Sequence, residues 1–422
     1  MSKHEFFYGI SMLLLPIIAF LAPTEWIMGR NAMFLALFIL TIQFVVCRES
    51  GYPLNKTWVL IAATVGCISL CQLGWVVHFG DKSVTGLLAN TQYAKTYKFL
   101  MPFSLLVFLT SAIPNKVIYR FRFALLGMIC LAFGVGAGEG IYTYFSESSA
   151  RANIGGISTT AAYLATIQGL LCIYAINTIA VRYKRCLMAL VSIVTFTIIV
   201  MTGTRSATLL FPIILLFMIL KSMALKDVIK IVPAFIALLT VPVIASHQIR
   251  DRFVEAYHEI SHESTNNSTS IGSRFSMWNS GLSTSSKHLL GQSAESRFND
   301  ITQYINANEK GNAEALRNIP YHLHNELIEI ASLQGIIPAA FMLTFYALTI
   351  MAFRKQGRTD LAAFTFTLPI VVFGIGDVLM IYPKAIFCVF AALCLYSLLI
   401  RIDSEVSTQA ENSSKAVTPE VY

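Results

Sequence analysis

The stretch from Ala385 to Ile400 reads AIFCVFAALCLYSLLI and contains no charged residue. A helix on the surface of a soluble protein has a polar face, whereas this stretch is apolar on every side. Similar runs recur along the chain, and short polar connections between them hold most of the charges. A membrane-spanning helix needs about 20 predominantly apolar residues, so the pattern predicts a chain that crosses a membrane many times.

The composition points to the same class of protein. Of the 422 residues, 55% are hydrophobic and 13% are charged, and the mean hydropathy is +0.64. Soluble domains carry roughly a quarter charged residues. The formal net charge of +8 comes largely from basic residues at the ends of apolar runs, where they set orientation, so we expect no nucleic-acid partner. The eight cysteines show no CxxC or metal-ligand spacing, so neither a disulfide framework nor a zinc site is indicated.

We therefore expect an all-α polytopic membrane protein with about twelve transmembrane helices and one large helical loop. Residues 1–246 would hold nine spans, residues 247–325 the loop, residues 326–401 three spans, and residues 402–422 a disordered tail. The predicted spans are Phe7–Leu21, Ala32–Val46, Trp58–Val77, Leu100–Ala112, Phe123–Tyr144, Thr159–Val181, Leu187–Met201, Ser206–Leu220, Ile229–Ser246, Ala331–Phe353, Leu361–Ile381 and Ala385–Ile400.

Basic residues set the expected orientation. With a cytoplasmic N-terminus, about sixteen Lys and Arg fall in short loops and ends on the cytoplasmic side and about seven in the opposite short loops, so the positive-inside rule places both termini in the cytoplasm. The large loop then lies on the extracytoplasmic side. It is too polar and too long for a simple connector, and we expect it to be functional. Helical spacing of its apolar residues occurs at Ile249, Phe253, Tyr257 and Ile260, and again at Phe275, Trp278 and Leu282.

Four arginines fall on the extracytoplasmic side, where the positive-inside rule gives no reason for them: Arg151, Arg205, Arg274 and Arg297. Arg205 lies in TGTRS between two apolar runs, which places it at headgroup depth. A guanidinium there offers a fork of donors that matches phosphate oxygens. Snorkelling to lipid headgroups, or a surface ion pair, would explain any one of the four alone. As a group they indicate a phosphate-binding site.

The segment YHLHNE at residues 321–326 marks the return of the large loop to the membrane. A histidine at the wet end of a helix can accept a proton from a hydroxyl near neutral pH. His322 and His324 also resemble two metal ligands, but residues i and i+2 of a helix point apart and no third ligand with matching spacing is near in sequence. Asp377 lies inside an apolar run, as does Glu139, and intramembrane carboxylates are functional candidates.

Four stretches together resemble the bacterial O-antigen ligase family: TGTRSATLLFP from Thr202, GSRFSMW from Gly272, SAESR from Ser293 and HLHNELIE from His322. Each motif is short, and their order and spacing around one large loop carry the resemblance. It covers most of the chain from Arg151 to Asp377. The first 120 residues match only in hydropathy.

The resemblance implies a GT-C-like fold at the bacterial inner membrane and an inverting, metal-independent glycosyl transfer at its periplasmic face, with no cofactor. The donor would be a glycan on undecaprenyl pyrophosphate, and the acceptor a sugar hydroxyl of lipid A–core. The family's catalytic histidine corresponds to His324, which stands before Asn325, although the second histidine, His322, departs from the pattern. The family's arginines correspond to Arg205 and Arg274, and less securely to Arg151. We add Arg297, Asn325 and Asp377 as expected substrate-binding residues, and expect no metal.

Two other functions are compatible with the topology. An O-antigen polymerase uses the same lipid-linked donor, but that family resembles a two-loop design with Arg-x10-Gly patterns. No glycine stands eleven residues after Arg151, Arg205 or Arg274. A lipid-linked oligosaccharide flippase or another transporter often shows internal repeats, and we find none. The sequence leaves the oligomeric state and the acceptor sugar open.

Overall fold

The computed structural model describes residues 2–47, 54–80, 86–146, 151–152, 157–179, 181–222, 268–354 and 360–417, together with Pro233, Thr240 and Val254. Over these residues the secondary structure is helical and contains no strand. Eight of the described helices are long and apolar enough to cross a membrane. The predicted class, an all-α polytopic membrane protein, is confirmed. The predicted ninth span, Ile229–Ser246, and the first loop helix, Ile249–Ile260, lie outside the described residues apart from isolated positions.

The helices before the large loop follow the predicted apolar runs and extend beyond most of them at one or both ends. They are α1 (Lys3–Leu21), α2 (Trp26–Val46), α3 (Lys56–Phe79), α4 (Leu88–Ser111), α5 (Asn115–Ser146), α6 (Ser158–Thr178), α7 (Lys184–Thr202) and α8 (Arg205–Ser222). The centre of the bundle is formed by α6 and by α18 (Pro383–Val417), whose membrane-spanning parts are almost completely buried. Both have apolar residues all round, as expected for helices away from water, and their burial shows that other helices surround them.

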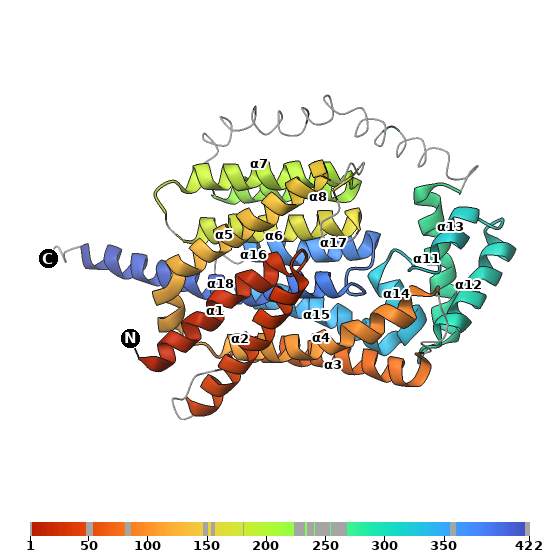
Figure 1. Ribbon diagram of the computed structural model, residues 1–422, viewed down its shortest axis with the longest axis horizontal. Coiled ribbons are helices and arrows are strands. Elements are labelled where there is room, and N and C mark those ends of the chain that lie inside the picture. The colour runs from red at the N-terminus through yellow and green to blue at the C-terminus, as the bar shows by residue number, and fades with distance from the viewer. Residues whose placement is uncertain are drawn as a thin grey trace.

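Part of the large loop forms a helical cap at one end of the bundle. The cap consists of α11 (Ser270–Lys287), α12 (Ala294–Asn308) and α13 (Ala313–Asn318). In Figure 1 these helices lie at the opposite end of the molecule from the start of α1 and the end of α18. The spacing of Phe275, Trp278 and Leu282 correctly predicted α11. A small core that includes Met277, Ile301 and Leu323 holds the cap together.

The last three predicted spans are less regular than the sequence indicated. The tenth is divided into α14 (Glu326–Gln334) and α15 (Ile336–Arg354) by Gly335, whose φ of +98° interrupts the helix. The eleventh comprises α16 (Asp360–Ala362), the π-helix η2 (Ala363–Thr367) and α17 (Leu368–Gly376). It ends before Asp377, which has an extended backbone.

The prediction of a disordered tail at 402–422 is wrong for its first part, because α18 continues to Val417. The polar residues after the span include Glu, Gln, Ala and Lys, which are good helix formers. Extending a helix that already exists avoids the cost of nucleation, so such a segment remains helical where an isolated peptide of the same sequence would not.

Candidate active site

Both histidines lie in the irregular turn between α13 and α14, at the base of the cap. His324 has a φ of +51°, a left-handed conformation that costs a non-glycine residue about 1–3 kcal/mol. Contacts on both sides of the turn stabilise this conformation. Trp278 Nε1 in α11 donates to the His324 carbonyl at 3.2 Å, and the side chain of Asn325 caps α14 by accepting from the N–H groups of Leu327 and Ile328, each at 3.1 Å.

The left-handed residue turns the two imidazoles toward each other. Their ring centroids are 4.3 Å apart and the rings are nearly perpendicular. The expectation that His322 and His324 point apart is therefore wrong, because it assumed a helix and these residues precede one. His322 is buried, whereas the His324 side chain is 23% exposed.

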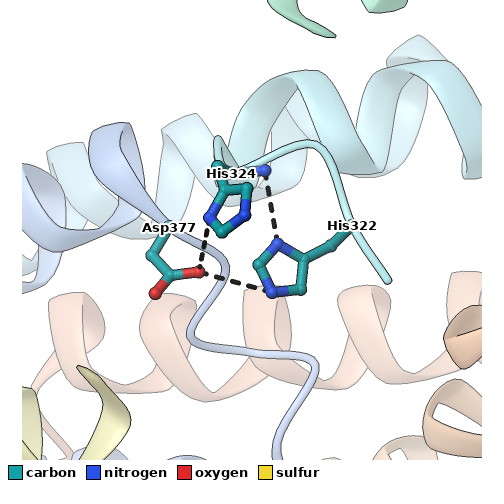
Figure 2. A group of neighbouring side chains, drawn as sticks. All are labelled: His322, His324 and Asp377. Atoms are coloured by element: carbon teal, nitrogen blue, oxygen red, sulfur yellow. Dashed lines mark hydrogen bonds and ion pairs between the residues drawn. The ribbon is translucent and has the colours of Figure 1, made fainter. Parts of the chain in front are cut away.

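Asp377 joins the two histidines from a distant part of the chain. Its Oδ1 lies 3.4 Å from His324 Nδ1 and 3.5 Å from His322 Nε2, and it accepts the Val378 N–H at 2.9 Å. Figure 2 shows both rings directed at this one carboxylate. The side chain is buried. The intramembrane carboxylate singled out in the sequence is thus a partner of the histidine pair.

The hydrogen bonds assign different roles to the two rings. His322 Nδ1 accepts the His324 backbone N–H at 3.3 Å, so in the neutral ring the proton is on Nε2, facing Asp377. Burial lowers the pKa of His322 to about 4, so the ring stays neutral at physiological pH. His324 turns Nδ1 toward Asp377, and a proton held there leaves Nε2 with its lone pair. His324 alone of this pair retains a nitrogen that can accept a proton.

Two carboxylates that the sequence analysis missed hold these segments in place. Glu326, at the first position of α14, accepts the backbone N–H groups of Leu379 at 2.6 Å and Met380 at 3.1 Å, which fixes the turn that carries Asp377. Glu329, one turn further along α14, accepts the Leu323 N–H at 2.9 Å, within the histidine turn. Acidic residues in the first turn of a helix were the available signal, but they are common there for electrostatic reasons alone.

Arg297 lies behind the histidine turn. It is only 3% exposed, and its Nη1 is 2.7 Å from Glu329 Oε1. Through Glu329 it supports the backbone of Leu323, between the two histidines. This placement shows a positioning contact, and the predicted contact of Arg297 with substrate remains a prediction.

We expect Arg297→Ala to lower the stability of the cap by about 3–5 kcal/mol, because it leaves the buried Glu329 carboxylate without its partner. Arg317→Ala is the matched control. It removes an exposed ion pair with Glu314 and should cost less than about 1 kcal/mol. Thermal unfolding of the two purified variants, compared with the unsubstituted protein, measures both effects. Equal melting temperatures for the two variants would contradict the role given to Arg297.

The structure brings Arg151 and Arg205 together. The Ala152 N–H donates to the Met201 carbonyl at 2.9 Å, which fastens the segment that carries Arg151 to the end of α7. There Gly203 has a φ of +66°, and a side chain at this position would lie 3.5 Å from Arg151 Nε. Arg205 follows two residues later as the first residue of α8. The N-terminus of a helix adds a partial positive charge to that of the guanidinium, which suits a phosphate ligand.

Tyr163 links Arg205 to the histidine site, by which we mean His322, His324 and Asp377. No sequence pattern had indicated Tyr163. It lies in α6, its ring stacks on Phe373 with centroids 4.1 Å apart, and its hydroxyl interacts with Ser206 and Asp377. It is also within electrostatic range of Arg274 in α11. Tyr163 therefore contacts both Asp377 and the residue after Arg205, and Arg274 acts on it electrostatically.

The three side chains of Figure 2 also form a metal-ligand set. One ligand atom from each of His322, His324 and Asp377 lies within 4.8 Å of the other two. Two imidazoles and a carboxylate are ligands that Zn²⁺ accepts. No third ligand with matching spacing is near the histidines in sequence, as expected, but the fold brings Asp377 to them from a distant part of the chain. The prediction that the protein works without metal stays a prediction.

Comparison with known proteins agrees with the geometry. Residues 188–343 match the family model described as O-antigen ligase. The chain is also similar to the O-antigen ligase of Escherichia coli (strain K12), with 26% identity over 344 residues that cover 79% of each protein. The predicted resemblance to the O-antigen ligase family is confirmed. Residues 188–343, which the family model matches, contain Arg205, Arg274 and both histidines, whereas Arg151 and Asp377 lie outside this range.

Proposed function

We propose that this protein transfers a glycan from undecaprenyl pyrophosphate to a sugar hydroxyl of lipid A–core, with inversion and without a metal, at the periplasmic face of the bacterial inner membrane. The observation that supports the proposal is the Asp377–His324 pair, in which His324 can act as a general base. The pair lies where the cap meets the membrane helices. The arginines close to it provide the charge that a diphosphate leaving group requires.

The chemistry is one displacement at the anomeric carbon of the donor. The acceptor oxygen forms the new bond to this carbon while the bond to the diphosphate oxygen breaks, and the electron pair leaves with the diphosphate. His324 Nε2 takes the acceptor proton, and the Asp377 carboxylate stabilises the imidazolium that results. Arg205 and Arg274, with Arg151 beside them, stabilise the charge that develops on the diphosphate.

Reconstitution tests this function. Purified protein would receive undecaprenyl-pyrophosphate glycan and lipid A–core in the presence of EDTA, and the ligated product would be sought on a gel. We expect product only when both lipids are present, with its anomeric configuration inverted. Longer glycans on undecaprenyl pyrophosphate would indicate a polymerase instead. Activity that EDTA abolishes and Zn²⁺ restores would place a metal in the His322, His324 and Asp377 cluster.

The proposal requires that the cap face the periplasm. Reporter fusions at Arg185 and Arg354 should score cytoplasmic, and fusions at Thr269 and Lys310 periplasmic, because basic residues are concentrated in the loops of the first pair. Paired reporters that are active on opposite sides of the membrane measure this directly. A cytoplasmic signal from Thr269 would overturn the proposed function, since the lipid-linked donor and the core acceptor meet outside the cytoplasm.

A further inference from the structure

A cavity with two lysines in its lining lies beside the histidine site. It has a volume of 500 Å³ and is lined by residues of α2, α4, α6 and α18 and the turn before α18, among them Lys95, Lys384, Trp26, Phe99 and Tyr382. The two lysines come from helices far apart in the sequence and meet at this one cavity. Its volume is in the range typical of small-molecule sites.

Tyr382 is the wall that the cavity shares with the histidine site. Its ring is nearly perpendicular to that of His322, with centroids 6.2 Å apart, and His322 in turn contacts His324. A ligand in the cavity would therefore lie one aromatic ring away from the histidine pair. The cavity is close enough to hold one part of a substrate whose reactive hydroxyl reaches His324.

The lining combines positive charge with an aromatic wall. The Trp26 ring packs edge-on against Phe99 at 5.3 Å. Glu139, the other carboxylate inside an apolar run, acts electrostatically on Lys384, and the charged residues among the described lining of the cavity are Lys95 and Lys384. Aromatic side chains beside basic ones are typical of the level where lipid headgroups lie. This chemistry suits a phosphate group attached to a lipid.

We propose that the cavity between α2, α4, α6 and α18 binds the phosphate of the acceptor glycolipid through Lys95 and Lys384. This inference rests on the proposed function, in which the arginines already hold the diphosphate of the donor. In an inverting displacement the nucleophile and the leaving group occupy opposite faces of the sugar ring. The lysine cavity contacts the histidine pair through Tyr382, whereas the arginines are connected to it through Tyr163 and Asp377, so the two lipids would reach the site through different contacts.

The test compares Lys95→Ala/Lys384→Ala with Lys98→Ala in the reconstituted ligation. Lys98 is an exposed lysine one turn along α4 that does not line the cavity. We expect the double variant to raise the KM for phosphorylated lipid A–core at least about tenfold, because a charge-assisted hydrogen bond contributes about a factor of ten or more in affinity. The KM for the donor should not change. Lys98→Ala should leave both unchanged, and Lys95→Arg/Lys384→Arg should recover most of the acceptor affinity.

Two further measurements distinguish failure of the lysine cavity as a binding site from failure of the proposed function. Lipid A–core from which the phosphates have been removed should show the raised KM with the unsubstituted protein, and the double variant should raise it no further. Native mass spectrometry of the protein with phosphorylated lipid A–core tests binding even if no ligation occurs, so failure of the proposed function is separable from failure of this site. An unchanged acceptor KM with undiminished binding would overturn the inference. A raised donor KM would also overturn it, by assigning the cavity to the diphosphate lipid.

Discussion

Arg205→Ala should abolish ligation while the protein remains in the membrane at its usual level. Arg205 begins α8 directly after the left-handed turn at Gly203, so its guanidinium and the helix N-terminus act on the same region. A guanidinium can donate two parallel hydrogen bonds to a diphosphate, each contributing about 1.5–3 kcal/mol, so their loss should lower the rate by at least about a hundredfold. Product formation by purified variant, with immunoblotting of the membrane fraction, measures both parts.

Arg205→Lys separates charge from geometry. Lysine keeps the positive charge but loses the planar fork, so we expect little recovery of activity. Lys221→Ala, at the other end of the same helix, is the control for a general loss of charge and should be nearly as active as the unsubstituted protein. Near-normal activity of Arg205→Lys would mean that Arg205 supplies only positive potential. Arg274→Ala should resemble Arg205→Ala, because Arg274 acts electrostatically on Tyr163, whose hydroxyl interacts with Ser206 beside Arg205.

The parts of the fold that could be predicted are those set by hydropathy. Helix α6 and the membrane-spanning part of α18 are largely apolar runs, and in lipid the polar backbone groups of such a run must be hydrogen-bonded within it, which leaves few alternatives to a helix. The interruption at Gly335 could not be predicted, because a glycine in an apolar run is compatible with an intact helix as well as with a break. The helical tail was missed because polar composition resembles disorder when the preceding helix is ignored.

The sequence could predict single residues of the candidate site but not the contacts between them. Arg205 and His324 stood out because charged or titratable groups occurred where the topology gave no reason for them. Their partners did not, because contacts between distant segments leave no local pattern. Asp377 reaches the histidines only because Glu326 binds the backbone of the turn that follows it, and Tyr163 lies within an ordinary apolar run.

The pairing of histidine variants has the sharpest expected outcome. His324→Ala should lose about two orders of magnitude or more in turnover, since general-base assistance contributes about 10²–10⁴-fold, while the lipid-linked donor still binds. His322→Ala should lose much less. One nitrogen of His322 accepts the His324 backbone N–H and the other faces Asp377, so this ring can position its neighbour but has no free lone pair for an acceptor proton. Turnover and donor binding, measured separately on both variants, test the assignment.

Two substitutions that preserve contacts make the comparison stricter. In His322→Asn, the amide oxygen can replace Nδ1 as acceptor of the His324 N–H, so activity should exceed that of His322→Ala. In His324→Asn, the amide nitrogen can still donate toward Asp377 but is not a base, so activity should stay as low as in His324→Ala. An inactive His322→Ala beside an active His324→Ala would reverse the two roles. Two active alanine variants would remove histidine from the chemical step and leave proton acceptance to another group near Asp377.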